Sequence, residues 1–316
     1  MNSIKTRVKI IAGFVLFLFV TCSVGMAQGE PKISGYVKSS FQHSQKISET
    51  TVSNARIKIS GSIDNLTSYT VFIDGVRDDV LLDAFVNREI AGGLSVKVGQ
   101  YKTPFSTDNL TAATKVSFIN RPYTKNDTSP AFRDKGVQFT YKNKYFDAMA
   151  AALNGSGQNN SEYNNNKTMA YRFVAKVLPQ LNVTGNYATG NNSPADDETD
   201  DFVNVGANGN VAGVEYSAEF ARMKHGDLTK SAYFAWLSYD FDMSSELITM
   251  LTPALRVEMS DPDDDMDDDA KSRYTIGLTA QMAQKFANRI MVNYEVRDVE
   301  TGETDNMLGL EYQVTF

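Results

Sequence analysis

Apolar and polar residues alternate along most of the chain. Between Pro31 and Phe316 no apolar run is long enough for a buried helix, and each alternating stretch covers about ten positions. The clearest stretch is the last, where single small or polar residues separate Leu308, Leu310, Tyr312, Val314 and Phe316. Successive side chains of a β-strand point to opposite faces, so this period of two predicts strands.

The pattern predicts sixteen strands, an even number. They cover residues 32–43, 51–63, 67–75, 80–90, 94–105, 136–143, 145–155, 168–178, 181–190, 201–208, 211–224, 230–241, 247–260, 272–282, 289–299 and 306–316. Short turns, such as 143–144 and 208–210, alternate with mostly longer polar loops. We therefore predict an all-β fold, a transmembrane antiparallel β-barrel of about 16 strands with short periplasmic turns and longer extracellular loops.

The polar face of the predicted strands carries full charges in mid-strand. A soluble β-sandwich or β-helix would also give alternating strands, but charges at mid-strand favour a wall that lines water. A barrel of about 16 strands is too wide for side chains to fill, so the interior is predicted to be an aqueous channel.

The predicted lumenal wall is mixed in charge. Its positive residues are Lys38, Arg56, Lys58, Lys97, Lys142, Arg172, Lys176, Arg256, Arg273 and Arg297. Its negative residues are Asp83, Glu89, Glu215, Glu219, Asp240, Glu258, Glu295 and Glu311. With ten positive residues against eight negative ones, the wall as a whole does not predict strong anion selection.

The N-terminus has the pattern of a secretory signal peptide. Three basic residues, the last of them Lys9, precede an apolar run over 10–20, and small residues follow at Gly25 and Ala27. A membrane anchor is disfavoured because the run is shorter than the roughly 20 residues of a membrane-spanning helix. A lipoprotein, in which Cys22 would carry the lipid, is disfavoured because Thr21 is unusual before a lipidated cysteine. We predict a signal peptide at 1–27, cleavage after Ala27, and a barrel domain at 28–316.

Composition excludes several classes of protein. Mean hydropathy is −0.32, which is too low for a bundle of membrane helices, because each helix needs about 20 mostly apolar residues. A single Cys excludes a disulfide scaffold and any multi-cysteine metal site. The acidic balance, 31 Lys and Arg against 38 Asp and Glu, disfavours nucleic acid as a partner. No cofactor or catalytic motif is found, since His43 and His225 stand without a recognisable nucleophile or carboxylate pattern.

Three short stretches resemble the phosphate-selective porin O and P family. Residues 98–106, VGQYKTPFS, are similar to that family's Gly-x-Phe/Tyr-Lys-x-Pro-Phe stretch. Residues 118–122, FINRP, and 133–138, RDKGVQ, resemble its "aromatic-x-x-Arg" and "Arg-Asp-x-Gly-Val" elements in the expected order. The resemblance implies a trimeric, 16-stranded outer-membrane porin. The terminal Phe316 is similar to the aromatic residue that typically ends such barrels.

The longest connection is predicted to form the pore constriction. It runs over 107–135, belongs to the long-loop rim and carries more basic than acidic residues. Its basic residues are Lys115, Arg121, Lys125, Arg133 and Lys135. Long loops in compact folds are usually functional or disordered, and we expect this one to fold into the lumen. The alternative is a solvated external loop.

Two acidic tracts, 196–201 and 261–269, fall in long-loop positions. The second resembles a calcium loop but lacks the Gly and closing Glu of an EF-hand. We expect solvated loop tips, loosely bridged by divalent cations to anionic lipid, and predict no specific metal site.

The sequence thus favours an outer-membrane porin for small hydrophilic solutes or ions, with a weak anion preference. The expected partners are outer-membrane lipid, two further copies in a homotrimer and the barrel-assembly machinery, which would act on Phe316. Alternatives are a non-conducting structural or adhesive barrel with acidic surface loops, and a secreted soluble β-protein.

Overall fold

The computed structural model describes residues 30–191, 198–299, 302 and 304–316. The predicted signal peptide 1–27 and the cleavage after Ala27 therefore lie outside the described residues. No helix in the described part is both long and apolar enough to span a membrane.

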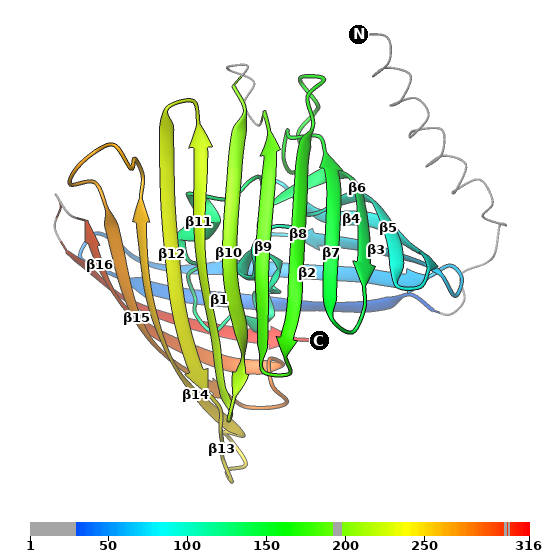
Figure 1. Cartoon of the computed structure of the whole chain (residues 1–316). Helices are drawn as coiled ribbons and strands as arrows, with labels where there is room; N and C mark the ends of the chain where they lie inside the picture. Colours follow the sequence, from blue (N-terminus) through cyan, green and yellow to red (C-terminus); the bar gives the residue numbers. More distant parts are fainter. Residues whose placement is uncertain (1–29, 192–197, 300–301, 303) are drawn as a thin grey trace, which may run out of the picture.

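Within these residues, sixteen long strands and one two-residue strand form a single antiparallel sheet that closes on itself (Figure 1). The strands are β1 (Lys32–His43), β2 (Ser48–Ser62), β3 (Thr67–Asp74), β4 (Leu81–Ala91), β5 (Leu94–Lys102), β6 (Arg133–Lys142), β7 (Phe146–Leu153), β8 (Thr168–Leu178), β9 (Leu181–Gly190), β10 (Asp200–Val211), β11 (Val214–His225), β12 (Leu228–Tyr239), β13 (Phe241–Asp242), β14 (Met250–Asp261), β15 (Lys271–Gln281), β16 (Asn288–Val299) and β17 (Asp305–Thr315). The predicted β-barrel is confirmed.

The first and last strands close the ring. Strand β1 pairs antiparallel with β17, from Tyr36 opposite Thr315 to His43 opposite Leu308. The pairing is extended by Gly35 and Phe316, whose N–H groups donate to each other's carbonyl oxygens at 2.8 and 2.9 Å. A Cβ on Gly35 would lie only 2.6 Å from Cζ of the Phe316 ring. Glycine at 35 therefore leaves the space in which this aromatic ring packs.

Several predicted boundaries differ from the structure by a few residues, and two of the differences change a connection between strands. The predicted turn at 208–210 lies inside β10, and the chain reverses instead at Ala212 and Gly213, which have φ of 51° and 87°. The Asn-Gly at 208–209 is a strong turn signal, yet here it continues the pairing with β11. The predicted strand 230–241 ends at Tyr239, and β13 resumes the pairing with β14 after Asp240.

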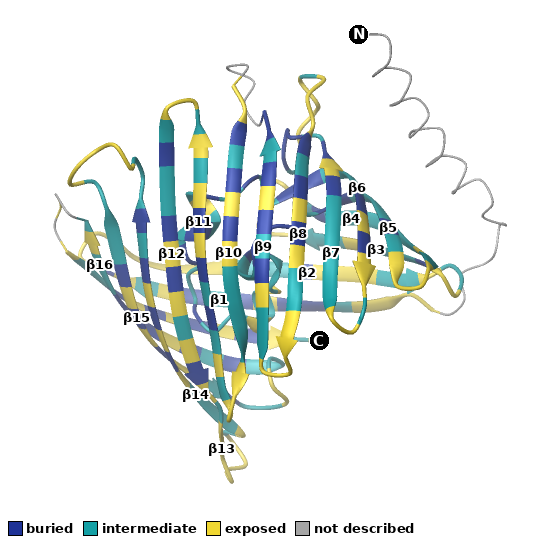
Figure 2. Cartoon of the chain, viewed as in Figure 1, coloured by how far each residue is buried: buried dark blue, intermediate teal, exposed yellow. Residues whose placement is uncertain are grey.

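The sheet exposes apolar residues on its outer face and buries polar residues on its inner face, the opposite of a water-soluble protein. Along β17, Leu308, Leu310 and Tyr312 are exposed, whereas Glu311 and Gln313 between and beside them are buried. The same alternation appears as bands of buried and exposed positions along the strands in Figure 2. An apolar outward face and a polar inward face are typical of a barrel surrounded by lipid.

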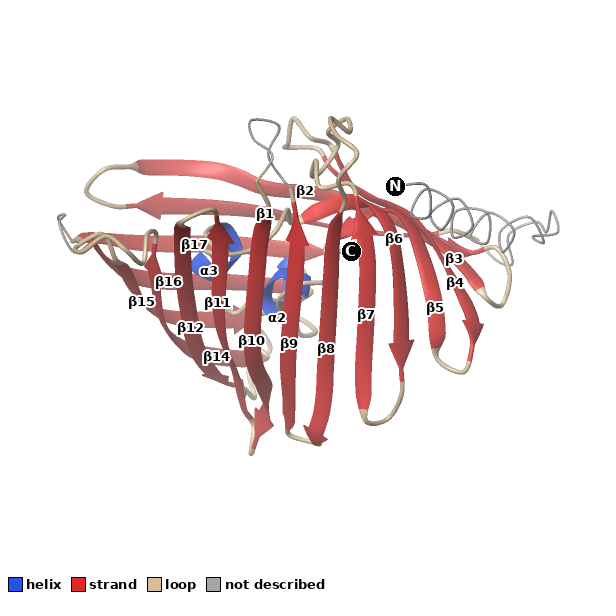
Figure 3. Ribbon diagram, turned by 45° about the horizontal axis from the view of Figure 1, so that its top comes forward, coloured by secondary structure: helices blue, strands red, loops and turns tan. Residues whose placement is uncertain are grey.

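The connection between β5 and β6, residues 103–132, lies inside the ring of strands (Figure 3). It contains the short helices α2 (Thr107–Leu110) and α3 (Tyr123–Asn126) and the 3-10 turn η1 (Ala113–Lys115). Strand β6 begins at Arg133, so the last three residues of the predicted loop 107–135 belong to a strand.

The glycines of the two stretches that flank this connection face each other. Gly99 of β5 pairs with Gly136 of β6. A Cβ on Gly99 would lie 2.1 Å from the carbonyl oxygen of Ala84, and one on Gly136 would lie 2.2 Å from that of Ala152. Only glycine permits this approach of neighbouring backbones, so these stretches fix how the chain enters and leaves the interior.

Candidate pore constriction

The start of the interior loop is held by a buried carboxylate on the far wall. Glu219 of β11 accepts hydrogen bonds from Ser106 Oγ at 2.6 Å and from the backbone N–H groups of Thr107 and Asp108 at 2.7 and 3.0 Å. Ser106 has a φ of 61°, a value that is strained for a residue other than glycine. The bonds to Glu219 hold the backbone in that conformation.

A row of polar side chains connects Glu219 to neighbouring strands. Asn204 donates to Glu219 at 2.8 Å, and Asn186 donates to Asn204 at 2.6 Å. Arg172 of β8 donates to Asn186 at 2.7 Å and to Thr107 Oγ1 at 2.9 Å. The first turn of the loop is therefore fixed to four consecutive strands.

A second anchor holds the middle of the loop against β14, β15 and β16. Arg256 and Arg273 donate to the backbone carbonyls of Asn120 and Arg121 at 2.7 and 2.6 Å. Glu258 accepts from the N–H of Tyr123 at 2.8 Å and from Arg273. Further bonds join Asn120 to Glu295 at 3.0 Å and Ile119 N–H to Asn293 at 2.7 Å.

Two cations, one at the end of β5 and one in the loop, bind backbone carbonyls near the start of the loop. Lys102 donates to the carbonyls of Asn109 and Thr111 at 2.7 and 3.0 Å. Arg121 donates to the carbonyls of Asp108 and Thr111 at 2.7 and 2.8 Å and pairs with the Asp108 carboxylate at 3.1 Å. These bonds satisfy carbonyls at the end of α2, which has no continuing helix to accept from.

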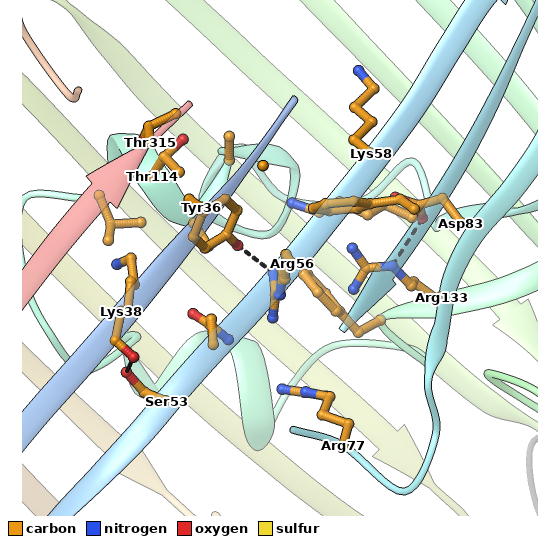
Figure 4. A pocket seen from close by; sticks show the side chains of 18 of the residues that line it. Tyr36, Lys38, Ser53, Arg56, Lys58, Arg77, Asp83, Thr114, Arg133 and Thr315 are labelled. Atoms are coloured by element: carbon orange, nitrogen blue, oxygen red, sulfur yellow. Dashed lines mark hydrogen bonds and ion pairs between the residues drawn. The ribbon is translucent and has the colours of Figure 1, made fainter. Parts of the chain in front are cut away.

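A cavity of about 530 Å³ lies between the loop and the wall made by β17 and by β1 to β6. We call it the basic cavity, because its charged lining consists of Lys38, Arg56, Lys58, Arg77, Lys102, Arg121, Lys125 and Arg133 against Asp83 and Glu311. Figure 4 shows Arg56, Arg77 and Arg133 turned toward one space. The eight cations come from strands, from the β3–β4 connection and from the interior loop.

Acidic neighbours compensate only part of this charge. Glu311 pairs with Lys38 at 2.6 Å and Asp83 with Arg133 at 2.8 Å. Two acids outside the lining, Asp74 and Asp108, pair with Arg56 at 2.7 Å and with Arg121. Counting all four carboxylates, the cavity keeps four positive charges in excess. Among the described residues, Lys58, Lys102 and Lys125 have no carboxylate within ion-pair distance, and of these three only Lys102 bonds to backbone carbonyls.

An aromatic ring helps to gather the cations. The charged groups of Lys102, Lys125 and Arg133 lie 4.9, 4.9 and 4.8 Å from the ring centre of Phe132. A cation near a ring face is attracted by the ring quadrupole, which offsets part of the mutual repulsion. Burial, together with the nearby guanidinium of Arg121, lowers the pKa of Lys125 to about 8.

The predicted constriction residues separate into groups. Arg121, Lys125 and Arg133 line the basic cavity together with Arg56 and Lys58 of the predicted wall. Lys115 lines a different cavity, and Lys135 donates to the carbonyl of Asn160 in the β7–β8 connection.

The remaining predicted wall residues have other surroundings. Arg172, Arg256 and Arg273 anchor the loop, and Arg297 pairs with Glu295 at 2.6 Å. Lys97 lies over the rings of Phe85 and Tyr101, and Lys176 pairs with Asp147 near the β6–β7 turn. They share the inward face without lining the basic cavity.

Two cations of the cavity were not identified from the sequence. Lys102 lies in the family-like stretch 98–106, next to the start of the loop, and its position there was an available signal. Arg77 lies in the six-residue connection between β3 and β4, where nothing in the sequence distinguishes it from a solvated loop residue.

A closed ring of antiparallel strands, apolar outside and polar inside, with a loop fixed across its interior, defines an outer-membrane porin, a water-filled channel for passive diffusion of small hydrophilic solutes. Residues 38–227, more than half of the chain, match the family described as phosphate-selective porin O and P. The chain belongs to that family and is a protein of the bacterial outer membrane.

Solved structures share the fold at low sequence identity. An anion-selective porin from Comamonas acidovorans is 12% identical with a TM-score of 0.70, over 91% of this chain and 99% of that one. A loop L8 deletion mutant of OmpT from Vibrio cholerae is 12% identical with a TM-score of 0.68, over 91% and 99%. OmpF of Salmonella typhi, in complex with daunomycin, is 13% identical with a TM-score of 0.67, over 90% and 97%. No curated protein matches the sequence.

Proposed function

We propose that this porin prefers small anions, of the phosphate class, and that the basic cavity makes the selection. The observation that carries the proposal is the excess of four cations around one space of about 530 Å³. A narrow passage with charge of one sign and low-dielectric walls concentrates counter-ions and excludes ions of its own sign. The family description and the anion-selective porin of similar fold support this preference.

The interior loop forms the constriction in this proposal. Arg121 and Lys125 contribute charge from the loop, and Arg56, Lys58 and Arg133 contribute it from the wall. The anchors at Glu219 and Glu258 keep the loop at a fixed distance from that wall. A solute would therefore cross the barrel between two fixed basic surfaces.

Further parts of the proposal concern targeting and assembly. We infer that residues 1–27 are a signal peptide cleaved after Ala27, and that the barrel-assembly machinery recognises Phe316. The protein is proposed to act as a homotrimer in outer-membrane lipid. Its function is transport without catalysis, and we assign no cofactor and no metal.

Ion selectivity in planar bilayers tests the proposal. The reversal potential across a salt gradient should indicate anion preference in the wild type. Lys58→Gln combined with Lys125→Gln removes the two lining cations that, among the described residues, have neither a carboxylate partner nor a side-chain hydrogen bond. The double variant should lower the anion-to-cation permeability ratio by about two- to fivefold. Lys144→Gln, on the exposed β6–β7 turn, is the matched control and should leave the ratio unchanged.

Two results would contradict the proposal. An unchanged ratio in the double variant would remove the basic cavity as the selective element. A folded protein without any stepwise conductance would instead favour the non-conducting structural barrel.

A further inference from the structure

A second cavity lies on the other side of the interior loop. It measures about 480 Å³ and is bounded by the loop and by β10, β11, β12 and β14. Val116 and Arg121 line both cavities, so this part of the loop is the partition between them. We call the second space the aromatic cavity.

Two aromatic rings form one corner of the aromatic cavity. Phe118 of the loop meets Trp236 of β12 edge to face, with ring centres 6.4 Å apart and planes at 70°. The Arg256 guanidinium covers Phe118 at 4.6 Å from its ring centre. Phe118 is buried by these contacts, whereas Trp236 remains partly exposed toward the cavity. Its ring is a flat apolar surface available to a solute.

The wall beside this corner is a row of inward-facing hydrogen-bonding side chains. Strand register places Asn208 opposite Ser217, and Ser217 opposite Trp236. The next inward-facing pair toward the β10–β11 turn is Asn210 opposite Glu215. Directly opposed residues have Cβ atoms about 5 Å apart, so amide, hydroxyl and carboxylate groups lie within the width of one small solute.

Several of these groups are available to a ligand. Among the described residues, Asn208, Ser217 and Glu215 have no side-chain hydrogen-bond partner in the barrel, although all three line the cavity. An asparagine amide provides two donors and an acceptor, a serine hydroxyl provides one donor, and a carboxylate accepts several bonds. A polar wall of this kind exchanges hydrogen bonds with a solute more readily than one whose groups are already paired.

The charges of the aromatic cavity balance. Asp108 pairs with Arg121, and Arg256 is held by Glu258 at 3.0 Å. Lys115 and Glu215 remain as one positive and one negative charge. Unlike the basic cavity, this space has no field that favours anions.

We propose that the aromatic cavity binds a neutral polyhydroxylated solute of the saccharide class. The apolar face of a sugar ring would lie on Trp236, and its hydroxyls would exchange hydrogen bonds with Asn208, Ser217 and Glu215. Pockets that combine an aromatic wall with a few placed polar groups are typical small-molecule sites. The site is separate from the anion-selective function proposed above and does not depend on it.

The single tryptophan of the chain makes the test direct. Trp236 is the only Trp in the sequence, so intrinsic tryptophan emission of the full-length processed protein, folded in detergent, reports on this cavity. We would titrate maltose as the probe, with inorganic phosphate and L-alanine as comparison solutes. Maltose should give a saturable change in emission, and the other two solutes should not.

Variants locate the binding. Asn208→Ala and Glu215→Gln should each weaken the apparent maltose affinity by about three- to tenfold, the effect of losing one or two hydrogen bonds. Asn87→Ala removes an inward-facing asparagine that lines a different cavity near the β4–β5 turn and should leave the affinity unchanged. Gel electrophoresis in SDS verifies that each variant is folded, because an unheated, folded barrel migrates differently from the same sample after heating.

Three outcomes would overturn the proposal. The first is the absence of a saturable change with maltose in folded, conducting protein. The second is an equal affinity in Asn208→Ala, Glu215→Gln and Asn87→Ala. The third is saturation by L-alanine in place of maltose, which would assign the balanced pair Lys115 and Glu215 to a zwitterion. Since emission is read without measuring ion selectivity, failure here is distinct from failure of the anion proposal.

Discussion

At the scale of single residues, Lys125 gives the basic cavity a dependence on pH. Its pKa is lowered to about 8, first by burial and then by the charge of Arg121. The lysine is positive below that pH and neutral above it. Because Lys125 has no carboxylate partner among the described residues, its charge contributes to the excess that attracts anions.

We therefore expect anion preference to fall as pH rises from 7 to 9, by about twofold in the permeability ratio. Reversal potentials measured across this range in wild type and in Lys125→Gln test the assignment. The variant should have a lower ratio at pH 7 and a smaller change in the ratio between pH 7 and 9, whereas Lys144→Gln should keep the full change. An identical titration in Lys125→Gln and wild type would show that another group is responsible.

Residues with the same predicted role have different tasks in the folded chain. Arg121 and Arg256 were both predicted to face the channel, yet each uses its guanidinium on backbone carbonyls of the loop. Lys58 and Lys125 were predicted by the same reasoning and have no such bond among the described residues. Charge and facing direction follow from sequence, but the partner of a charge depends on which strands meet across the barrel.

At the scale of elements, the interior loop depends on its anchor at Glu219. This buried carboxylate accepts from three donors at the start of the loop, and a hydrogen bond to a charged group contributes about 1.5–3 kcal/mol. Glu219→Gln keeps the shape of the side chain but replaces one acceptor oxygen with an NH2 group. This donor would face the donor groups that now bond to Glu219, so some of these hydrogen bonds would be lost.

We expect Glu219→Gln to loosen the loop, which should raise single-channel conductance and add rapid flicker to the open state. Glu89→Gln, at the turn end of β4, makes no loop contact and serves as the control. Current traces in planar bilayers give both readouts. If Glu219→Gln has the same conductance as wild type and no added flicker, the anchor at Glu258 is sufficient to hold the loop and the role given to Glu219 is wrong.

Strand β5 enters the loop through Gly99, whose φ of 132° is strained for other residues. A Cβ there would also lie 2.1 Å from the carbonyl oxygen of Ala84. Gly99→Ala should destabilise the barrel by about 1–3 kcal/mol, the cost of strained backbone.

Gly185→Ala is the matched substitution, since a Cβ at 185 meets nothing within 4 Å. Urea midpoints of the two variants in detergent give the comparison. We expect a lower midpoint for Gly99→Ala alone, and equal midpoints would contradict the role given to Gly99.

At the scale of the whole molecule, the exposed apolar face is predicted to contact lipid. Ile276, in the middle of β15, and Ile33, near the end of β1, are 62% and 66% exposed. An arginine facing lipid costs about 2–4 kcal/mol at the bilayer centre and about 0–1 near the surface.

Ile276→Arg should therefore destabilise the barrel in lipid vesicles by about 2–4 kcal/mol, and Ile33→Arg by about 1 kcal/mol or less. Denaturant unfolding in vesicles provides the measurement. Equal costs at the two positions, which are similarly exposed, would indicate that the outward face does not lie across a bilayer.

The sequence by itself determined the barrel. The period of two fixes which residues share a face, and neighbouring strands pair through local turns, so the approximate number of strands and the inward polar face follow from the order of residues along the chain. Its clearest error lies where a local signal competes with pairing, at Asn208 and Gly209, which continue β10 although Asn-Gly favours a turn.

The tertiary structure alone decided the sites. Counted along the wall, ten positive and eight negative residues nearly cancel. In the folded chain, Glu219, Glu258 and Glu295 bond to the loop on one wall. On the other wall, Lys58 of that count is joined by Arg77 and Lys102, which the count did not include. These partners are far apart in sequence, and electrostatic interaction depends on distance in space. The loop that crosses the ring therefore creates both the basic cavity and the aromatic cavity.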